Sequence, residues 1–409
     1  MFEERRIVKR WDELMENCFK EGDMRYLVYS IKKEDWGYNL MVTIPAGKRF
    51  EDLEKLKDAI KVFYPCNVEM EIRKLTSLAN VKLITKDFSS QAFKPIKLKS
   101  NELLFGYDLM DDPIIVDMNE FPHVLIAGMT GQGKSRLLLI ILTNLLYSYE
   151  NNMEIYLTAL SKNDHKIFKD HPAVKSYLRD IADIKKLYEN LNKLREKREE
   201  IIDKAGCINI SEYNNKSKFK MSYIYIFADE FSLYMPDDSD SKQVEEDKKV
   251  ALALLKIIIK EARSAGIFVI LGIQVSTYQE MPTIIRRCCN VKVTFKQSDE
   301  VSSKVIINTT DAIFLEKQEF IIFSDSYIHC KTPYIDSNIV KSCISVPKTE
   351  KPPQTNIVNA QLIITSIQDV EPRKYKKHCE QIFKKVEDLS NVGQLPRGKR
   401  GVLNANSKR

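Results

Sequence analysis

One segment of the sequence combines glycines, a lysine and a serine at a spacing suited to binding phosphate. Residues 128–135 read Gly-Met-Thr-Gly-Gln-Gly-Lys-Ser, which satisfies the pattern G-x-x-x-x-G-K-[ST]. The apolar stretch HVLIA precedes them and RLLLIILTNLL follows, which predicts a strand before the segment and a helix after it. Glycines let backbone amides turn toward phosphate oxygens, and the helix presents its positive end to them. The segment therefore predicts a phosphate-binding loop for ATP.

The last two residues of this segment have separate expected roles. Lys134 would contact the β- and γ-phosphates, and Ser135 would offer its hydroxyl to Mg²⁺. A glycine turn that only caps a helix does not explain a lysine and a serine at these positions. The residues expected to bind the nucleotide are Gly128, Met129, Thr130, Gly131, Gln132, Gly133, Lys134, Ser135 and Arg136.

Polar residues follow two further apolar stretches. The stretch YIYIFA ends at Asp229 and Glu230, and the stretch GIFVILGI ends at Gln274. In open parallel sheets ligands bind at the carboxyl ends of the strands, so these side chains are expected near the phosphate-binding loop. Asp229 would hold Mg²⁺ together with Ser135, and Glu230 would align or deprotonate the attacking water. Gln274 would sense the γ-phosphate, although a glutamine in an ordinary loop is the alternative.

Three segments with these motifs resemble the FtsK/SpoIIIE family of DNA translocases, and more narrowly its conjugative coupling ATPases from Gram-positive elements. They read FGYDLMDDPIIVDMNEFPHVLIAGMTGQGKS, IFADEF and LLKIIIKEARSAGIFVILGIQVSTYQEMPTIIRRCCNVKVTFKQSDEVSSKVII. The earlier segments KRWDELMENC and GYNLMVTIPAGKRFEDLEKLKDAI are similar to the region before the motor in the conjugative branch. The resemblance covers residues 8–335, and the pair Pro122-His123 strengthens it.

The resemblance implies a RecA-like motor that forms a ring, as a hexamer, around double-stranded DNA without reading its sequence. ATP would bind between neighbouring subunits, and an arginine of one subunit would complete the site of the next. Candidates for that arginine are Arg263, Arg286 and Arg287. We take Arg263 as the catalytic candidate because its segment EARSAG matches the family, together with Lys134, Glu230 and Gln274.

Departures from the family pattern bear on partners. Leu160-Ser161-Lys162 stands where the chromosomal translocases read Asp-Pro-Lys. Neither a membrane anchor nor a DNA-reading winged-helix domain is recognisable, so we expect a cytoplasmic protein that reaches the membrane through partners such as channel or relaxosome proteins.

The apolar patterns predict an α/β fold with two parts. A small α/β unit precedes a RecA-like P-loop domain with a mainly parallel sheet, whose predicted strands are HVLIA, EIYLTAL, YIYIFA, GIFVILGI, VKVTF and EFIIF. The expected division is a helical segment at 1–29, the small domain at 30–98, the motor at 99–345, and a basic linker and helical tail at 346–409.

Composition excludes some classes of protein. Hydrophobic residues make up 44% of the 409 residues, but no run is long enough for a membrane helix, and the eight cysteines lack the spacing of a zinc site. The net charge of +7 lies in residues 346–409, which hold 13 basic and 6 acidic residues. This tail suits either DNA contact or a solvated appendage.

Two other functions fit the same motifs. The first is a motor for another cargo, as in phage packaging or secretion. The second is an adaptor in replication or transfer that binds DNA under the control of ATP without moving it.

Overall fold

A computed structural model of the protein describes residues 2–20, 22–86, 92–160, 165–274 and 282–344. The predicted basic linker and tail at 346–409, and Ser161-Lys162 of the departure noted above, lie outside the described residues. Within the described ranges, no helix is long and apolar enough to cross a membrane.

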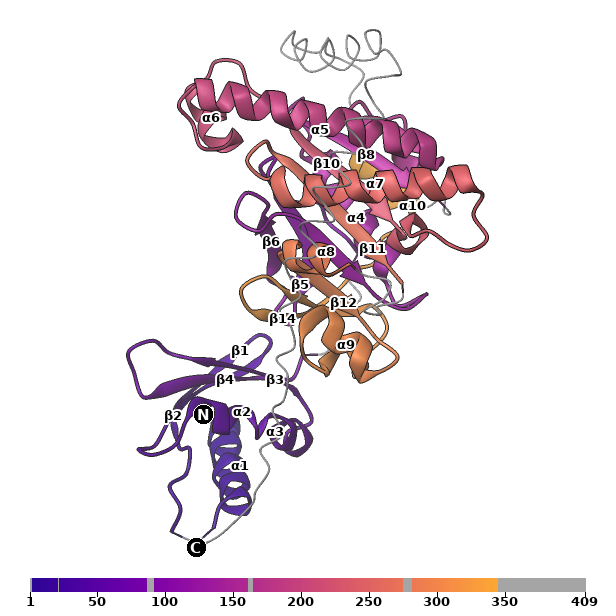
Figure 1. The fold of residues 1–409 in the computed structure, drawn as a ribbon. Helices are drawn as coiled ribbons and strands as arrows, with labels where there is room; N and C mark the ends of the chain where they lie inside the picture. The colour runs from indigo at the N-terminus through magenta and orange to yellow at the C-terminus, as the bar shows by residue number, and fades with distance from the viewer. Residues whose placement is uncertain (1, 21, 87–91, 161–164, 275–281, 345–409) are drawn as a thin grey trace, which may run out of the picture.

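The N-terminal part of the chain forms a four-stranded antiparallel sheet (Figure 1). Its strand order is β1-β2-β4-β3, and its strands and helices are α1 (Phe2–Cys18), β1 (Val28–Glu34), β2 (Gly37–Thr43), α2 (Phe50–Glu54), α3 (Lys57–Phe63), β3 (Asn67–Ile72) and β4 (Leu78–Ile84). Ile7, Trp11 and Leu14 of α1 recur at helical spacing and share one core with Leu40 and Val42 of β2. The apolar face of α1 is therefore covered by this sheet.

The second part of the chain forms a ten-stranded sheet of order β6-β5-β14-β13-β12-β7-β11-β10-β8-β9. Its strands are β5 (Glu102–Asp108), β6 (Pro113–Asp117), β7 (Val124–Ala127), β8 (Met153–Ala159), β9 (Val174–Leu178), β10 (Tyr223–Asp229), β11 (Ile267–Ile273), β12 (Val291–Phe295), β13 (Glu319–Phe323) and β14 (Tyr327–Lys331). The six strands from β12 to β9 run parallel. The predicted α/β fold, with a mainly parallel sheet preceded by a smaller α/β unit, is confirmed.

Helices cover both faces of this sheet (Figure 1). They are α4 (Lys134–Tyr147), α5 (Ile181–Lys204), α6 (Ile210–Lys216), α7 (Lys242–Glu261), α8 (Thr283–Cys288), α9 (Glu300–Ile307) and α10 (Ser337–Ile344), with short 3₁₀ helices η1 (Lys166–Phe168), η2 (Phe231–Tyr234) and η3 (Asp311–Ile313). Tyr225 and Phe227 of β10 join the core that α4 packs on, whereas Ile224 and Ile226 join the core of α5 and α7. Alternate side chains of a buried strand thus fill two cores.

Four strands of the large sheet depart from the parallel pattern. The stretch EFIIF, predicted among the parallel strands, forms β13 but pairs antiparallel with β12, as Val293↔Ile322 shows. β14, β5 and β6 continue this antiparallel part to the edge, and β5 and β6 were not predicted. A run of apolar residues reports burial but carries no information on strand direction. The division at 1–29, 30–98 and 99–345 stays a prediction.

Candidate functional site

The glycine-rich loop joins the end of β7 to the beginning of α4. Gly131 has φ of +80° and Gly133 has φ of +134°, which residues with a side chain rarely adopt. Gly133 is the residue before the first turn of α4, and its carbonyl accepts the amide of Leu137 at 3.0 Å. The first amides of a helix have no partner inside the helix, so this end of α4 suits an anion.

Phe295 packs beneath the loop and explains two of its glycines. A Cβ on Gly128 would lie 2.7 Å from the Phe295 Cβ, and a Cβ on Gly133 would lie 2.7 Å from its Cε1. Phe295 ends β12, the strand beside β7, and is fully buried. It was not predicted as a site residue because its contact depends on strand order.

Lys134 and the two carboxylates meet at the carboxyl ends of the strands. The Lys134 Nζ donates to Asp229 Oδ1 at 3.2 Å and lies 3.5 Å from Glu230 Oε2. All three side chains are buried, with 5%, 3% and 7% of their residues' surface exposed. Charges in so dry a place interact more strongly than at the surface. The fold thus brings three of the predicted residues into one charged cluster.

Glu230 is held by neutral groups as well. The Gln274 Nε2 donates to Glu230 Oε2, and the Gln274 Oε1 accepts from Thr130 Oγ1 at 2.9 Å. Ser232, which was not predicted, donates its hydroxyl to Glu230 Oε1 at 3.0 Å. The backbone of Glu230 is left-handed, with φ of 61°, a conformation that costs free energy and clusters at functional sites. Gln274 therefore links the glycine-rich loop to Glu230.

Two further predicted residues, Ser135 and Arg136, follow Lys134 in the first turn of α4. Ser135, in the first turn of α4, is half-buried beside Lys134. The Arg136 guanidinium lies 5.7 Å from the centre of the Tyr334 ring. A serine hydroxyl and the buried Asp229 carboxylate are oxygen donors of the kind that Mg²⁺ takes, so the residues present fit that ion.

Gly272 of β11 makes room for the cluster. A Cβ at this position would lie 2.8 Å from Asp229 Oδ1 and 3.4 Å from Lys134 Nζ. We expect Gly272→Ala to displace the Asp229 carboxylate and to lower the rate of ATP hydrolysis by about 10- to 100-fold, because misplacement by about 1 Å has effects of this size. Steady-state hydrolysis measures the effect.

The control for this variant is Gly206→Ala. Gly206 has φ of +62° and nothing within 4 Å of an added Cβ, so alanine there strains the backbone far from the cluster. A loss of turnover in both variants would indicate general destabilisation. Unchanged turnover in Gly272→Ala would contradict the steric role of the glycine.

The candidate arginines lie near the amino ends of the parallel strands, whereas the Lys134 cluster lies at their carboxyl ends. Arg263 lies four residues before the beginning of β11, whereas Asp229 ends β10 and the glycine-rich loop follows the end of β7. The seven residues of β11 separate the amino end of the strand from its carboxyl end by about 20 Å. Arg286 and Arg287 lie in the last turn of α8, which ends at Cys288, three residues before β12 begins at Val291. The structure does not bring these arginines to the Lys134 cluster of the same chain.

His123 also lies near the amino ends of the parallel strands. Its Nδ1 accepts the backbone amide of Val269 at 3.2 Å, and its own φ is 63°. Burial, with a smaller effect of Arg263, lowers the pKa of His123 from 6.5 to about 3. His171, whose Nδ1 accepts the amide of Ala173, has its pKa lowered to about 4 by burial.

The lowered pKa values of these two histidines predict that mild acid destabilises the folded protein. Their pKa values are lower in the folded protein than in the unfolded chain, so below pH 6.5 the unfolded chain binds more protons. The free energy of unfolding should fall as pH decreases from 6.5 toward 4, by up to about 1.4 kcal/mol per pH unit for each histidine, and neither should contribute a slope above pH 7.

Urea unfolding of the wild type and of His123→Asn checks this expectation. The Asn Oδ1 can accept the Val269 amide in place of Nδ1, and asparagine tolerates a positive φ. Stability of the variant should depend less on pH between 6.5 and 4 than that of the wild type. Equal slopes in the two proteins would contradict the lowered pKa of His123.

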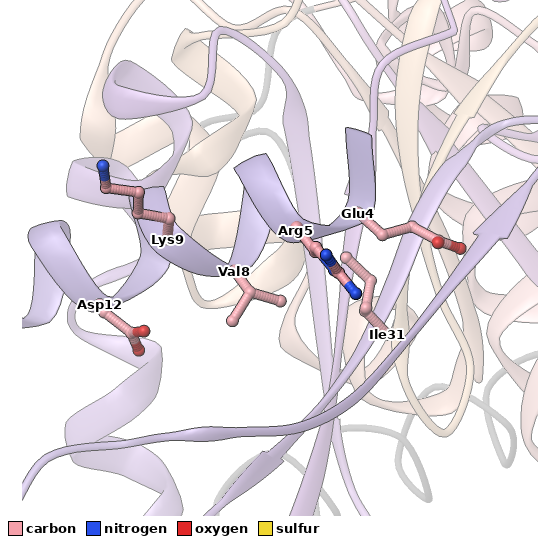
Figure 2. Close-up of a pocket in the computed structure, with 6 residues that line it drawn as sticks. All are labelled: Glu4, Arg5, Val8, Lys9, Asp12 and Ile31. Carbon is pink, nitrogen blue, oxygen red and sulfur yellow. The ribbon is translucent and has the colours of Figure 1, made fainter. Parts of the chain in front are cut away.

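A shallow pocket of about 400 Å³ lies on the small sheet, away from the Lys134 cluster (Figure 2). Figure 2 shows that α1 and β1 form it, and it is lined by Glu4, Arg5, Val8, Lys9, Asp12 and Ile31.

Known proteins resemble this chain in sequence. Residues 91–283 match the model of the FtsK/SpoIIIE family. The DNA translocase FtsK of Chlorobaculum tepidum is 28% identical over 233 residues, which are 53% of this chain and 28% of that protein. The DNA translocase SftA of Bacillus subtilis is 24% identical over 283 residues, which are 64% of this chain and 28% of that protein. The chain thus spans under a third of the length of these relatives.

Solved structures share its fold. The pCW3 conjugation coupling protein TcpA has a TM-score of 0.59 and 17% identity, and the match covers 83% of this chain and 99% of TcpA. EssC (ATPases 2 and 3) from Geobacillus thermodenitrificans has a TM-score of 0.52 and 14% identity, with 76% and 54% covered. At these identities the likeness concerns the fold alone.

Proposed function

We propose that this chain, whose residues 91–283 match the model of the FtsK/SpoIIIE family, is an ATPase of that family that couples ATP hydrolysis to movement of double-stranded DNA. The observation that carries the proposal is the buried cluster in which Lys134 contacts both Asp229 and Glu230 at the N-terminus of α4. The DNA translocases among its relatives support DNA as the cargo.

The proposed mechanism assigns each group a step. The loop amides and Lys134 would bind the β- and γ-phosphates, and Ser135 and Asp229 would hold Mg²⁺, which would supply positive charge to offset the negative charge of the phosphates. Glu230 orients the attacking water and accepts its proton. Gln274, which contacts Glu230, reports whether the γ-phosphate is present.

We propose that the active form is a ring, a hexamer, with ATP between subunits. Arg263 lies near the amino ends of the parallel strands, and Lys134 of the same chain lies at their carboxyl ends. Arg263 would therefore complete the site of a neighbouring subunit, where it would stabilise charge on the transferred phosphoryl group. Because the chain shares its fold with the conjugation coupling protein TcpA, the transfer that we propose is that of conjugative or mobile-element DNA. Partner proteins at a membrane channel or a relaxosome would then recruit the ring.

Steady-state ATP hydrolysis with linear double-stranded DNA, with single-stranded DNA and without DNA tests the cargo. We expect double-stranded DNA to stimulate turnover whatever its sequence, and the stimulation to weaken steeply as salt rises, because contacts to phosphates release counterions. Hydrolysis that ignores DNA would favour a motor for another cargo. The fold shared with the Type VII secretion ATPase EccC of Thermomonospora curvata, with a TM-score of 0.51 and 16% identity, makes that the second candidate.

A further inference from the structure

The end of α7 turns sharply before β11 begins. The amide of Gly266 donates to Arg263 O at 3.0 Å, and the amide of Ile267 donates to Ala262 O at 3.1 Å. These two bonds, with Gly266 at φ of +70°, form a Schellman motif, which closes the last turn of a helix. Arg263 projects from this closed turn, so the geometry of the turn sets where its side chain begins.

Two other carbonyls of the same turn are held by separate elements. The Ser264 carbonyl accepts the amide of Ile210, at the beginning of α6, at 2.8 Å. The Ala265 carbonyl accepts from the Arg198 Nη1, on α5, at 2.8 Å. The carbonyls at a helix end lack partners within the helix. Groups from α5 and α6 therefore donate hydrogen bonds to the two carbonyls that the Schellman motif does not use.

Arg198 is an unusual residue for this task because it is buried. Only 2% of its surface is exposed, and its Nε and Nη2 have no hydrogen-bond partner among the described residues. Burial lowers the pKa of Arg198 to about 10, and the nearby Glu154 opposes that effect. A buried charge costs free energy, and an apolar side chain of similar size often replaces it without loss of stability. The hydrogen bond to Ala265 is what the guanidinium adds.

A second arginine of α5 contacts the same end of α7. The Arg195 Nη1 lies 3.5 Å from Glu261 Oε2, one helical turn from Arg198. The exposed Arg263 itself donates from Nε to the carbonyl of Asn119 at 2.9 Å. The turn is therefore tied to α5, to α6 and to the segment before β7.

We propose that Arg198 is a positioning residue, which fixes the turn so that Arg263 reaches the ATP site of a neighbouring subunit. The inference rests on the proposed function of the chain as a ring ATPase. Arg198 would act through Arg263 without touching ATP itself, and its loss would let the turn move.

The test compares steady-state hydrolysis by Arg198→Met with that by Lys197→Met. Lys197 is exposed on the same helix, so its variant loses the same charge without touching the turn. We expect Arg198→Met to lower kcat by about 10- to 100-fold with little change in the KM for ATP, because the distant loop and Lys134 still bind the phosphates. Lys197→Met should match the wild type.

A second variant guards against misfolding. Without Arg198 the buried Glu154 loses its nearby positive charge, so Glu154→Gln is combined with Arg198→Met to remove both charges. The Gln Oε1 can still accept the Tyr156 hydroxyl, which lies 3.0 Å from Glu154 Oε2. The double variant should fold and show the same low kcat.

Two further measurements separate positioning from a structural role. On an Arg263→Ala background, Arg198→Met should cause no additional loss, because residues that act through one group are not additive. Mixing Arg198→Met subunits with Lys134→Ala subunits should restore hydrolysis, since the second kind supplies a correctly placed Arg263 to the intact loop of the first.

The proposal is overturned if Arg198→Met has the same kcat as Lys197→Met, or if the loss of kcat caused by Arg198→Met adds fully to the loss caused by Arg263→Ala. It is likewise overturned if mixing the two kinds of subunit restores no hydrolysis, or if neither the single nor the double Arg198 variant folds. It is also overturned if Arg263→Ala hydrolyses ATP normally. In that case wild-type hydrolysis that depends on Lys134 still leaves the proposed ATPase function standing. Absence of any hydrolysis by the wild type would instead reject the proposed function itself.

Discussion

Replacing Lys134 with alanine is expected to lower the rate of ATP hydrolysis by at least about 100-fold, the usual effect of removing a charge-stabilising group from an active site. The Lys134 ammonium lies in contact with Asp229 and near Glu230, at the N-terminus of α4. It adds a full positive charge at the place where phosphates are expected to bind. Nucleotide binding should weaken as well, which a titration with fluorescent ATP measures.

The same change should also destabilise the fold. Without Lys134, two neighbouring buried carboxylates lose the ammonium group that they share, and breaking a buried ion pair typically costs about 3–5 kcal/mol. Urea unfolding therefore accompanies the kinetic measurement. Lys186→Ala, which removes an exposed lysine of α5, is the control. Wild-type turnover in a folded Lys134→Ala protein would refute the assigned phosphate site.

The glycine-rich loop and the two carboxylates could be predicted because their signals are local. Residues 128–135 carry their own turn geometry, and the strand β10 reads as an apolar run that ends at Asp229. Parallel strands place their carboxyl ends at one edge, so a rule of topology was enough to expect Lys134 and Glu230 near each other. The structure agrees with the position of each of these elements in the sheet.

Contacts that depend on strand order could not be predicted in the same way. Phe295 reaches the glycines of the loop because β12 lies next to β7, which no local pattern encodes. Gly272 did carry a signal, since a glycine inside a buried strand often marks a close approach of another group. The sequence carried no signal for the direction of β13, because an apolar run reads the same whether the strand is parallel or antiparallel to its neighbour.

The place of Arg198 on an apolar stripe can be recognised only when the bounds and the buried face of α5 are known. The buried residues Ile184, Leu191 and Ile202 define the apolar stripe of α5, and Arg198 falls on this stripe at helical spacing. A charge on an apolar stripe is either a snorkelling side chain or a buried group with a partner. Only the fold shows that the partner is the Ala265 carbonyl.

Substituting Glu230 with glutamine should lower turnover by about 10²- to 10⁴-fold, the range of a general base, while ATP still binds. Glutamine keeps an oxygen that can accept from Ser232, and Lys134 keeps its contact with Asp229. Removal of one negative charge from the phosphate site should leave ATP affinity equal or tighter. Turnover and equilibrium binding are measured on the same preparation.

The control is Glu200→Gln, which neutralises an exposed glutamate paired with Lys204 on α5. If Glu230→Gln binds ATP but neither hydrolyses it nor moves DNA, hydrolysis drives the movement, as a motor requires. If it hydrolyses ATP at the wild-type rate, Glu230 is not the base, and its left-handed backbone and contact with Gln274 need another explanation. If it lacks turnover yet supports every DNA-dependent step of the wild type, ATP serves only to switch assembly and the adaptor hypothesis replaces the motor.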